Sequence, residues 1–204
     1  MRVVLLNGSP HREGCTYTAL NEVRTTLESE GIATDMLWVG NGPVAGCTAC
    51  GYCDRHNRCV VDDQVNTLLD MPFDALVVGS PVYYGAASGQ VTCFLNRLFF
   101  AGSARMAGRF GAAVVSCRRG GATAAFDQLN KYFTIANMPV VPSQYWNQVH
   151  GNTPEQVKQD LEGLQTMRTL ARNLAWLLRL KQAGQDAGVA LPAHEPRVST
   201  NFIR

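Results

Sequence analysis

The sequence lacks any apolar run close to the roughly 20 residues that a membrane-spanning helix needs, and it has no strong excess of either charge. Lysine and arginine together number 18 and aspartate and glutamate 16, which gives a net charge of +2. A chain so nearly neutral has no broad basic surface for nucleic acid. Residues Met1–Asn7 begin an apolar strand pattern at once and do not resemble a secretory signal. We therefore expect a cytoplasmic protein that binds neither nucleic acid nor membrane.

Charged residues are also scarce, at 17% of the chain, whereas hydrophobic residues make up an ordinary 46%. A low charged fraction is expected where another subunit covers part of the surface. The 204 residues fit one domain with room for a full core. Cysteine, by contrast, is plentiful, with seven residues. In a cytoplasmic protein, cysteines indicate metal binding or redox chemistry rather than a disulfide framework.

Short apolar runs of β type alternate with helical patterns. Strands are predicted at Arg2–Asn7, Ile32–Val39, Phe73–Gly79, Phe110–Ser116 and, cut short by Pro142, Val140–Val141. Helices are predicted at Tyr17–Glu30, around Val65–Leu69, at Ser88–Phe100, from Gly121 to about Asn137, and from Thr153 to about Gly184. This alternation indicates an α/β fold with a five-stranded parallel sheet and helices on both faces. We predict one domain over residues 1–184, with a Cys-rich loop inserted at 40–59, and an extended or disordered tail over 185–204, which could instead form an arm across another subunit.

The segment Asn7–Thr16 joins the first strand to the first helix. It is rich in small and hydroxyl residues, and Arg12 adds a positive charge. The N–H groups and dipole at a helix start favour an anion, so the segment can bind phosphate. It lacks the glycine spacing of a dinucleotide site and the lysine of a nucleotide triphosphatase loop. An ordinary strand-to-helix turn is the alternative.

Two later loops have complementary chemistry. Pro81–Ala86 carries two tyrosines, whose flat faces can stack on a planar ring, although they can also simply close the end of the sheet. Ser116–Gly121 carries Arg118 and Arg119, which can neutralise an anion or lie in solvent. Because ligands of parallel sheets bind outside the carboxyl ends of the strands, we expect these loops and the first one to gather at one edge.

Three motifs carry a resemblance to a known family. The sequence resembles the flavodoxin-like NAD(P)H-dependent FMN reductases at Gly8–Pro10 with Gly14–Thr16, at Pro81–Gly85 and at Phe94–Arg97. A further motif, Gly46–Cys53, is similar to the iron–sulfur flavoproteins within that superfamily. The resemblance covers roughly residues 1–150 and implies a flavodoxin-like sheet of order 2-1-3-4-5. It implies that the first loop holds the FMN phosphate, through Ser9, His11, Arg12, Gly14, Cys15 and Thr16. It also implies that the later loops border the isoalloxazine ring, through Pro81, Val82, Tyr83, Tyr84, Gly85, Ser116, Cys117, Arg118, Gly120 and Gly121.

Two positions depart from that pattern. Cys15 stands where relatives often carry Asn, which leaves a backbone contact there. Asn96 stands where an Asp is common before the Arg, which puts a salt bridge at that point in doubt.

Four of the cysteines, Cys47, Cys50, Cys53 and Cys59, form the pattern C-x2-C-x2-C-x5-C. Four thiolates so closely spaced can hold a [4Fe–4S] cluster, and this spacing resembles the compact motif of the iron–sulfur flavoproteins. Zinc suits four thiolates equally well, and thiols without metal are the third possibility.

The remaining candidates are isolated. We predict Cys93 to be a small core residue, Cys117 to lie near the ring, and His56 to be exposed. Asp62 and Asp63 are predicted to cap the short helix that follows them rather than to act as catalytic acids.

Three functions follow from these predictions. The first is an FMN-dependent oxidoreductase, an enzyme that takes hydride from NAD(P)H and reduces a flavin, a quinone or a similar small acceptor. No catalytic side chain is identified, although Tyr84 is the candidate to lie beside the ring. The second is an iron–sulfur electron carrier with a ferredoxin-like partner, and the third is a non-enzymatic zinc or thiol redox module. Because the resembled proteins are commonly dimers or tetramers, a homodimer or homotetramer is expected.

Overall fold

The computed structural model describes residues 1–193, 195–196, 198–200 and 202. Its centre is a sheet with the order β2-β1-β3-β5-β6, in which neighbouring strands are parallel. These strands are β1 (Arg2–Asn7), β2 (Ala33–Trp38), β3 (Ala75–Tyr83), β5 (Phe110–Cys117) and β6 (Gln148–His150). The flavodoxin-like order predicted for five parallel strands is therefore confirmed. A sixth strand, β4 (Ala86–Ala87), pairs antiparallel with β3.

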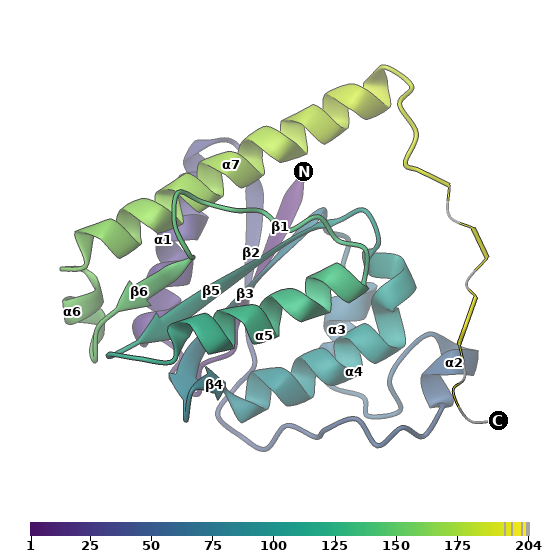
Figure 1. Cartoon of the computed structure of the whole chain (residues 1–204), viewed down its shortest axis with the longest axis horizontal. Coiled ribbons are helices and arrows are strands. Elements are labelled where there is room, and N and C mark those ends of the chain that lie inside the picture. Colours follow the sequence, from purple (N-terminus) through teal and green to yellow (C-terminus); the bar gives the residue numbers. More distant parts are fainter. Residues whose placement is uncertain (194, 197, 201, 203–204) are drawn as a thin grey trace.

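The helices cover both faces of this sheet, as Figure 1 shows. They are α1 (Cys15–Ser29), α2 (Tyr52–His56), α3 (Gln64–Asp70), α4 (Gly89–Met106), α5 (Ala122–Ile135), α6 (Pro154–Val157) and α7 (Leu161–Asp186). Along β1, Val3 and Leu5 face a core formed with α1 and α7, whereas Val4 and Leu6 face the core under α3, α4 and α5. This alternation follows from the two-residue period of a strand, and it explains why these runs are apolar throughout.

The segment predicted as a loop after the third strand is instead a hairpin. β3 continues through Tyr83, because its register with β5 extends as far as Pro81 opposite Ser116. Tyr84 and Gly85 then form a two-residue turn with φ of 51° and 76°. Positive φ at both central positions is typical of the type I′ turn that matches strand twist.

The prediction for the end of the chain was wrong in two places. Val140 forms only an isolated bridge with Gly111, and the fifth parallel strand is β6, eight residues further on. The predicted long helix is divided into α6 and α7, because Asp160 interrupts it and caps α7 by accepting a hydrogen bond from Gly163 N at 2.9 Å.

Beyond Ala187, the described residues form neither helix nor strand. Leu191 lies beside Gly108, before the start of β5. The remainder of the predicted tail includes His194, Arg197, Asn201, Ile203 and Arg204, which lie outside the described residues. Within the described part of the chain, no helix combines the length and apolar character needed to cross a membrane.

Candidate functional site

The loop after β1 is braced by its own side chains. Asn7 Oδ1 accepts a hydrogen bond from Ser9 N at 3.1 Å, and its Nδ2 donates to Arg12 O at 3.0 Å. Ser9 Oγ accepts from His11 N at 3.1 Å. Trp38, at the end of β2, donates from Nε1 to Ser9 O at 2.8 Å. These four bonds fix the backbone of the loop before any ligand arrives.

Helix α1 begins at Cys15, two residues before the predicted start, so Cys15 and Thr16 belong to its first turn. Its N-cap is Gly14, which offers no side-chain hydrogen bond, and the first turn carries no acidic residue. The first N–H groups of a helix have no partner within it, so this end can receive an anion. Arg12 is exposed and lies 5.8 Å from the centre of the Trp38 ring.

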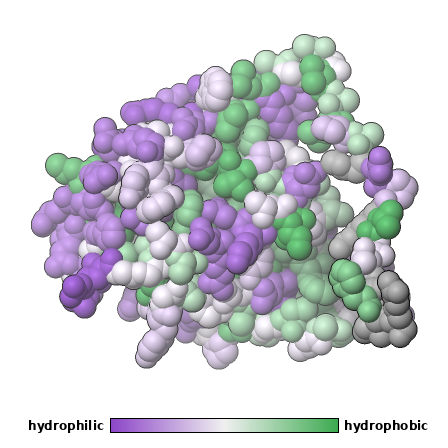
Figure 2. All heavy atoms as spheres, viewed as in Figure 1, coloured by the Kyte–Doolittle hydropathy of each residue, from purple (hydrophilic) through white to green (hydrophobic). Residues whose placement is uncertain are grey.

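A pocket of about 930 Å³, open to solvent, lies over this loop. Its wall includes residues from elsewhere in the chain that the sequence did not identify: Trp38, Asn41, Asn152, Thr153 and Pro154. Figure 2 shows mostly hydrophilic side chains on the left of this view, over α6, β6 and the beginning of α7. The end of α1 therefore faces a pocket that is open to solvent.

The first and third predicted loops are in contact. Thr16 Oγ1 and Ser116 Oγ, both buried, share a hydrogen bond of 2.8 Å. Cys15 Sγ is 3.7 Å from Gly151 O, and burial raises the pKa of this thiol. The hydroxyl of Thr16 thus points toward β5, whereas Cys15 points toward the segment after β6.

The second and third loops also meet. Gly121 has φ of 89°, and a Cβ there would lie 2.9 Å from both Gly85 Cα and Val82 Cγ1. Beside this contact, Tyr83 is 42% exposed and Tyr84 is fully exposed. Ser88 Oγ donates to Gly8 O at 2.6 Å, which joins the start of α4 to the first loop. All three predicted loops therefore meet at the carboxyl edge of the sheet.

Of the other predicted residues in the third loop, Arg118 and Gly120 are exposed, whereas Cys117 is buried. Cys117 Sγ lies 3.4 Å from His150 Nδ1, a neighbour that the sequence did not suggest. Burial raises the pKa of the Cys117 thiol, and the charge of Asp160 raises it further, against a lowering by the backbone at Arg119.

The four motif cysteines line a single pocket of about 390 Å³ that includes its open mouth. Cys47 and Cys50 are exposed, and Cys53 and Cys59 are half-buried. Burial raises the pKa of Cys53, and the nearby charges of Asp54, Cys47 and Cys50 raise it further. The thiols of Cys47, Cys50 and Cys53 are therefore close enough for their charges to interact.

Among the described residues, no three thiol, imidazole or carboxylate side chains converge as ligands of a single ion. A cluster has several irons, each of which binds a different thiolate, so its ligands surround it rather than meet at one point. Four thiols line one pocket with apolar walls at Val60, Phe100 and Ala101, and this donor set suits soft metals.

A buried arginine closes the inner side of this pocket. Arg97, on α4, donates from Nη1 to Cys59 Sγ at 3.6 Å and from Nη2 to Asp63 Oδ2 at 2.5 Å. Burial acts to lower the pKa of Arg97, but its hydrogen bonds and charge contacts with Asp63 and Cys59 raise it overall. The doubt over an ion pair at this motif is thus resolved: Arg97 pairs with Asp63, and Asn96 accepts a hydrogen bond from Tyr132.

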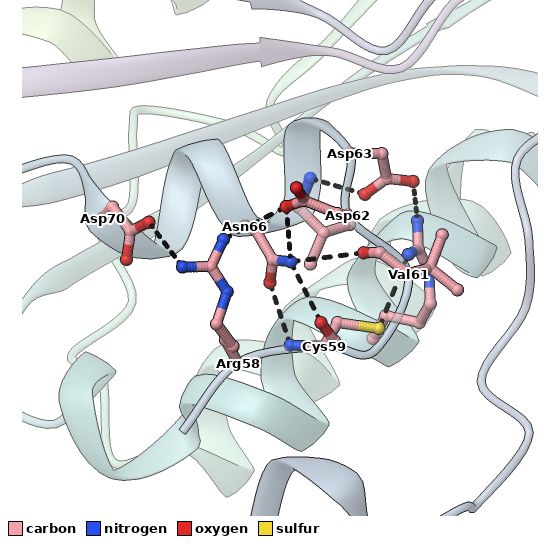
Figure 3. A network of polar contacts seen from close by, with 9 residues as sticks. Arg58, Cys59, Val61, Asp62, Asp63, Asn66 and Asp70 are labelled. Carbon is pink, nitrogen blue, oxygen red and sulfur yellow. Dashed lines mark hydrogen bonds and ion pairs between the residues drawn. The ribbon is translucent and has the colours of Figure 1, made fainter. Parts of the chain in front are cut away.

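Asp63 also caps α3, as predicted, by accepting from Val65 N at 3.0 Å. Asp62 has a different role, because it accepts from Asn66 and from Arg58. Figure 3 shows Asn66 at the centre of this network, where it bonds Cys59 through both its amide oxygen and nitrogen. The last cysteine of the motif is therefore fixed by α3 as well as by α4.

Two further predictions have clear outcomes. Cys93 is half-buried rather than a core residue, and its sulfur lies near Gly46 at the start of the cysteine motif. His56 is exposed, as expected, and stacks on Tyr52 with ring centres 4.1 Å apart.

The parallel sheet, the uncapped helix end and the loops at the carboxyl edge define the flavodoxin-like class of α/β proteins. Residues 1–153 match the family model described as NADPH-dependent FMN reductase, and the chain belongs to this family. An iron–sulfur flavoprotein of Methanocaldococcus jannaschii is 29% identical over 192 residues, which cover 88% of this chain and 98% of that protein.

Two solved structures show the same fold. The NAD(P)H:quinone oxidoreductase from Methanothermobacter marburgensis has a TM-score of 0.65 at 14% identity, over 85% of this chain and 96% of that one. A flavodoxin from the domain Archaea has a TM-score of 0.60 at 14% identity, over 88% and 99% of the two chains.

Proposed function

We propose that this protein is an FMN-dependent oxidoreductase that takes electrons from NAD(P)H and passes them to a quinone, a flavin or a similar acceptor. The observation that carries the proposal is the end of α1, which has no side-chain cap and lies where three loops meet. Family membership supports the same reaction class.

In this proposal, the N–H groups of the first turn of α1 bind the FMN phosphate, with Ser9 and Arg12 beside them. His11, Gly14, Cys15 and Thr16 complete that end of the site. The hairpin and the third loop, which contact each other, would together border the ring through Pro81, Val82, Tyr83, Tyr84, Gly85, Ser116, Cys117, Arg118, Gly120 and Gly121. FMN held there would supply the hydride acceptor, while the hairpin would exclude water from one side and Tyr84 would present a flat face to the nicotinamide.

The cysteine pocket supports an alternative of a different kind. Relatives named iron–sulfur flavoprotein span nearly the whole chain, and all four motif cysteines line one pocket. We propose that this pocket holds a [4Fe–4S] cluster, in which case the protein can also carry electrons from a ferredoxin-like partner to FMN. A zinc or thiol module without flavin is the third possibility.

Absorption spectra of anaerobically purified protein, with iron and sulfide assays, separate these functions. Flavin bands with oxidation of NAD(P)H support the reductase. Flavin and iron without turnover of either nicotinamide support the carrier. A colourless protein that does not bind added FMN would leave the zinc or thiol module.

The role of the motif cysteines is tested by Cys50→Ser. This change should abolish iron binding, because Cys50 lines the cysteine pocket. FMN should stay bound, because Cys50 belongs to none of the three loops at the carboxyl edge of the sheet. Cys93→Ser is the matched control, since Cys93 lies near Gly46 but does not line the pocket. Iron retained in Cys50→Ser, or lost equally in both variants, would count against Cys50 as a ligand.

We also propose that the chain forms a homodimer or homotetramer. Phe100 and Ile135 are 62% and 82% exposed, and they line a shallow hollow between α4, α5 and the cysteine loop, of about 1580 Å³ when the solvent at its mouth is included. An apolar hollow of this kind is typical of an interaction surface.

A further inference from the structure

Arg97 is the most deeply buried charge near the cysteine pocket. Its side chain is 1% exposed, and arginine is rarely so buried unless it is paired. Two of its donors reach Cys59 and Asp63, and its Nε is buried with no hydrogen-bond partner among the described residues. The guanidinium therefore retains a donor beyond those used by the ion pair.

Apart from Arg97 and the thiols, the described residues that line the pocket carry no charge, although Asp54 lies close enough to act on Cys53. Of the described residues that line it, Arg97 alone is a lysine, arginine, aspartate or glutamate, and the walls around it include Val60, Phe100 and Ala101. In such apolar surroundings a charge acts over a short distance with little screening. Asp63 and Cys59 are bonded by different terminal nitrogens of the guanidinium, and the Asp63 side chain is 37% exposed, so it offsets the positive charge only in part.

We propose that Arg97 sets the reduction potential of the cysteine centre, held against Cys59 by its ion pair with Asp63. This inference rests on the proposed cluster. Reduction adds one electron, supplied by nicotinamide through the flavin or by dithionite in a titration, and no bond forms or breaks. The added negative charge is stabilised by a fixed positive charge beside a ligand sulfur, so Arg97 raises the potential of the cluster.

The test is a mediated redox titration of anaerobically purified full-length protein, with the cluster followed by electron paramagnetic resonance and iron assayed in each variant. Arg97→Met should keep its iron and shift the cluster to a more negative potential, while the flavin potential stays unchanged. Arg97→Lys keeps the charge, so its cluster potential should stay close to that of the wild type. Arg179→Met is the matched control. Arg179 lies on α7 and pairs with Glu30, so the variant removes the same charge from a distant ion pair and should change neither potential.

Asp63→Asn should shift the reduction potential of the cluster in the opposite direction. Asparagine can still cap α3, but the negative charge next to Arg97 is lost, so the cluster potential should move upward. If Arg97→Met fails to fold or loses iron, Arg97→Gln, which keeps side-chain hydrogen-bond donors without the charge, should give the same negative shift, and an unchanged cluster potential there would overturn the inference. Unchanged potentials in Arg97→Met, or a downward shift in Asp63→Asn, would overturn the inference while the cluster proposal stands. Wild-type protein without iron would overturn the cluster proposal, and this inference with it.

Discussion

Tyr84 has a backbone conformation that large side chains rarely adopt. Its φ is 51°, and its side chain is fully exposed at the tip of the hairpin. Such a residue costs about 1–3 kcal/mol relative to relaxed backbone, and such strain concentrates at functional sites. Replacement by asparagine would create Asn-Gly, a preferred sequence for this turn. We expect Tyr84→Asn to raise the free energy of unfolding by about 0.5–1 kcal/mol, measured by urea denaturation.

The same variant should lose activity, because the flat ring proposed to receive the nicotinamide is gone. We expect a higher KM for NAD(P)H with FMN still bound. Tyr83→Asn is the control, since Tyr83 lies in β3, where asparagine is unfavourable, and should therefore lose stability. A Tyr84→Asn protein that is more stable and fully active would show that the strained tyrosine has no catalytic purpose.

The thiol of Cys117 predicts a specific dependence of stability on pH. Its pKa is raised by burial above the ordinary value of 9.0, so the folded chain retains a proton that the unfolded chain releases. The contribution of Cys117 to the free energy of unfolding is therefore full below about pH 9 and is lost as the pH rises through the folded pKa. Urea denaturation at pH 8, 9 and 10 should show a smaller decline in Cys117→Ala than in the wild type. Equal declines would contradict this assignment.

At the scale of elements, the contact between the hairpin and the third loop depends on Gly121 and not on its neighbour Gly120. A Cβ at Gly121 would meet Gly85 and Val82 at 2.9 Å, whereas a Cβ at Gly120 would meet no atom within 4 Å. Gly121→Ala should therefore destabilise the fold by about 1–3 kcal/mol and weaken FMN binding at least tenfold. Gly120→Ala should change neither quantity appreciably. Fluorescence titration with FMN compares the two variants, and equal affinities would show that the hairpin contact does not shape the site.

The sequence predicted those elements whose structure is decided locally. Runs such as Val3–Leu6 are apolar on both faces, so their burial in a parallel sheet can be inferred from the residues alone. The hairpin was missed because Pro81 and Gly85 are typical of loops, and β3 continues only through its pairing with β5. β6 has three residues, and its existence depends on the same distant partner.

The site shows the same division. Ser9 and Arg12 could be proposed as site residues because they follow a strand and precede a helix within ten residues of sequence. Trp38 and Asn152 join them only through folding, since one ends β2 and the other follows β6. The contact of Arg97 with Cys59 spans 38 residues and joins α4 to an irregular loop. A contact between a helix and a distant irregular loop leaves no periodic pattern in the sequence, so it could not be predicted.

At the scale of the whole molecule, the cysteine pocket and the hollow between α4, α5 and the cysteine loop adjoin one another. Cys47, Ala49 and Phe100 line both. A second copy seated on α4 and α5 would therefore cover the mouth of the cysteine pocket and remove an exposed apolar surface at once. Figure 1 shows the segment that leads from β2 to α2 running along α4, where such a partner would meet it.

This arrangement predicts the effect of one surface charge on assembly. Ile135→Lys places an ammonium group in the apolar hollow, and burial of an unpaired charge opposes association. We expect the variant to shift from dimer or tetramer toward monomer, with association at least tenfold weaker by light scattering and sedimentation. FMN content should be unchanged, because Ile135 ends α5, far along the helix from Gly121. Trp176→Lys, which alters another exposed apolar side chain on α7, is the control. If the wild type is monomeric, or if only Trp176→Lys dissociates it, the α4–α5 surface is not the interface. If Ile135→Lys alone yields monomers whose iron is lost faster in air, the second copy also shields the cysteine pocket.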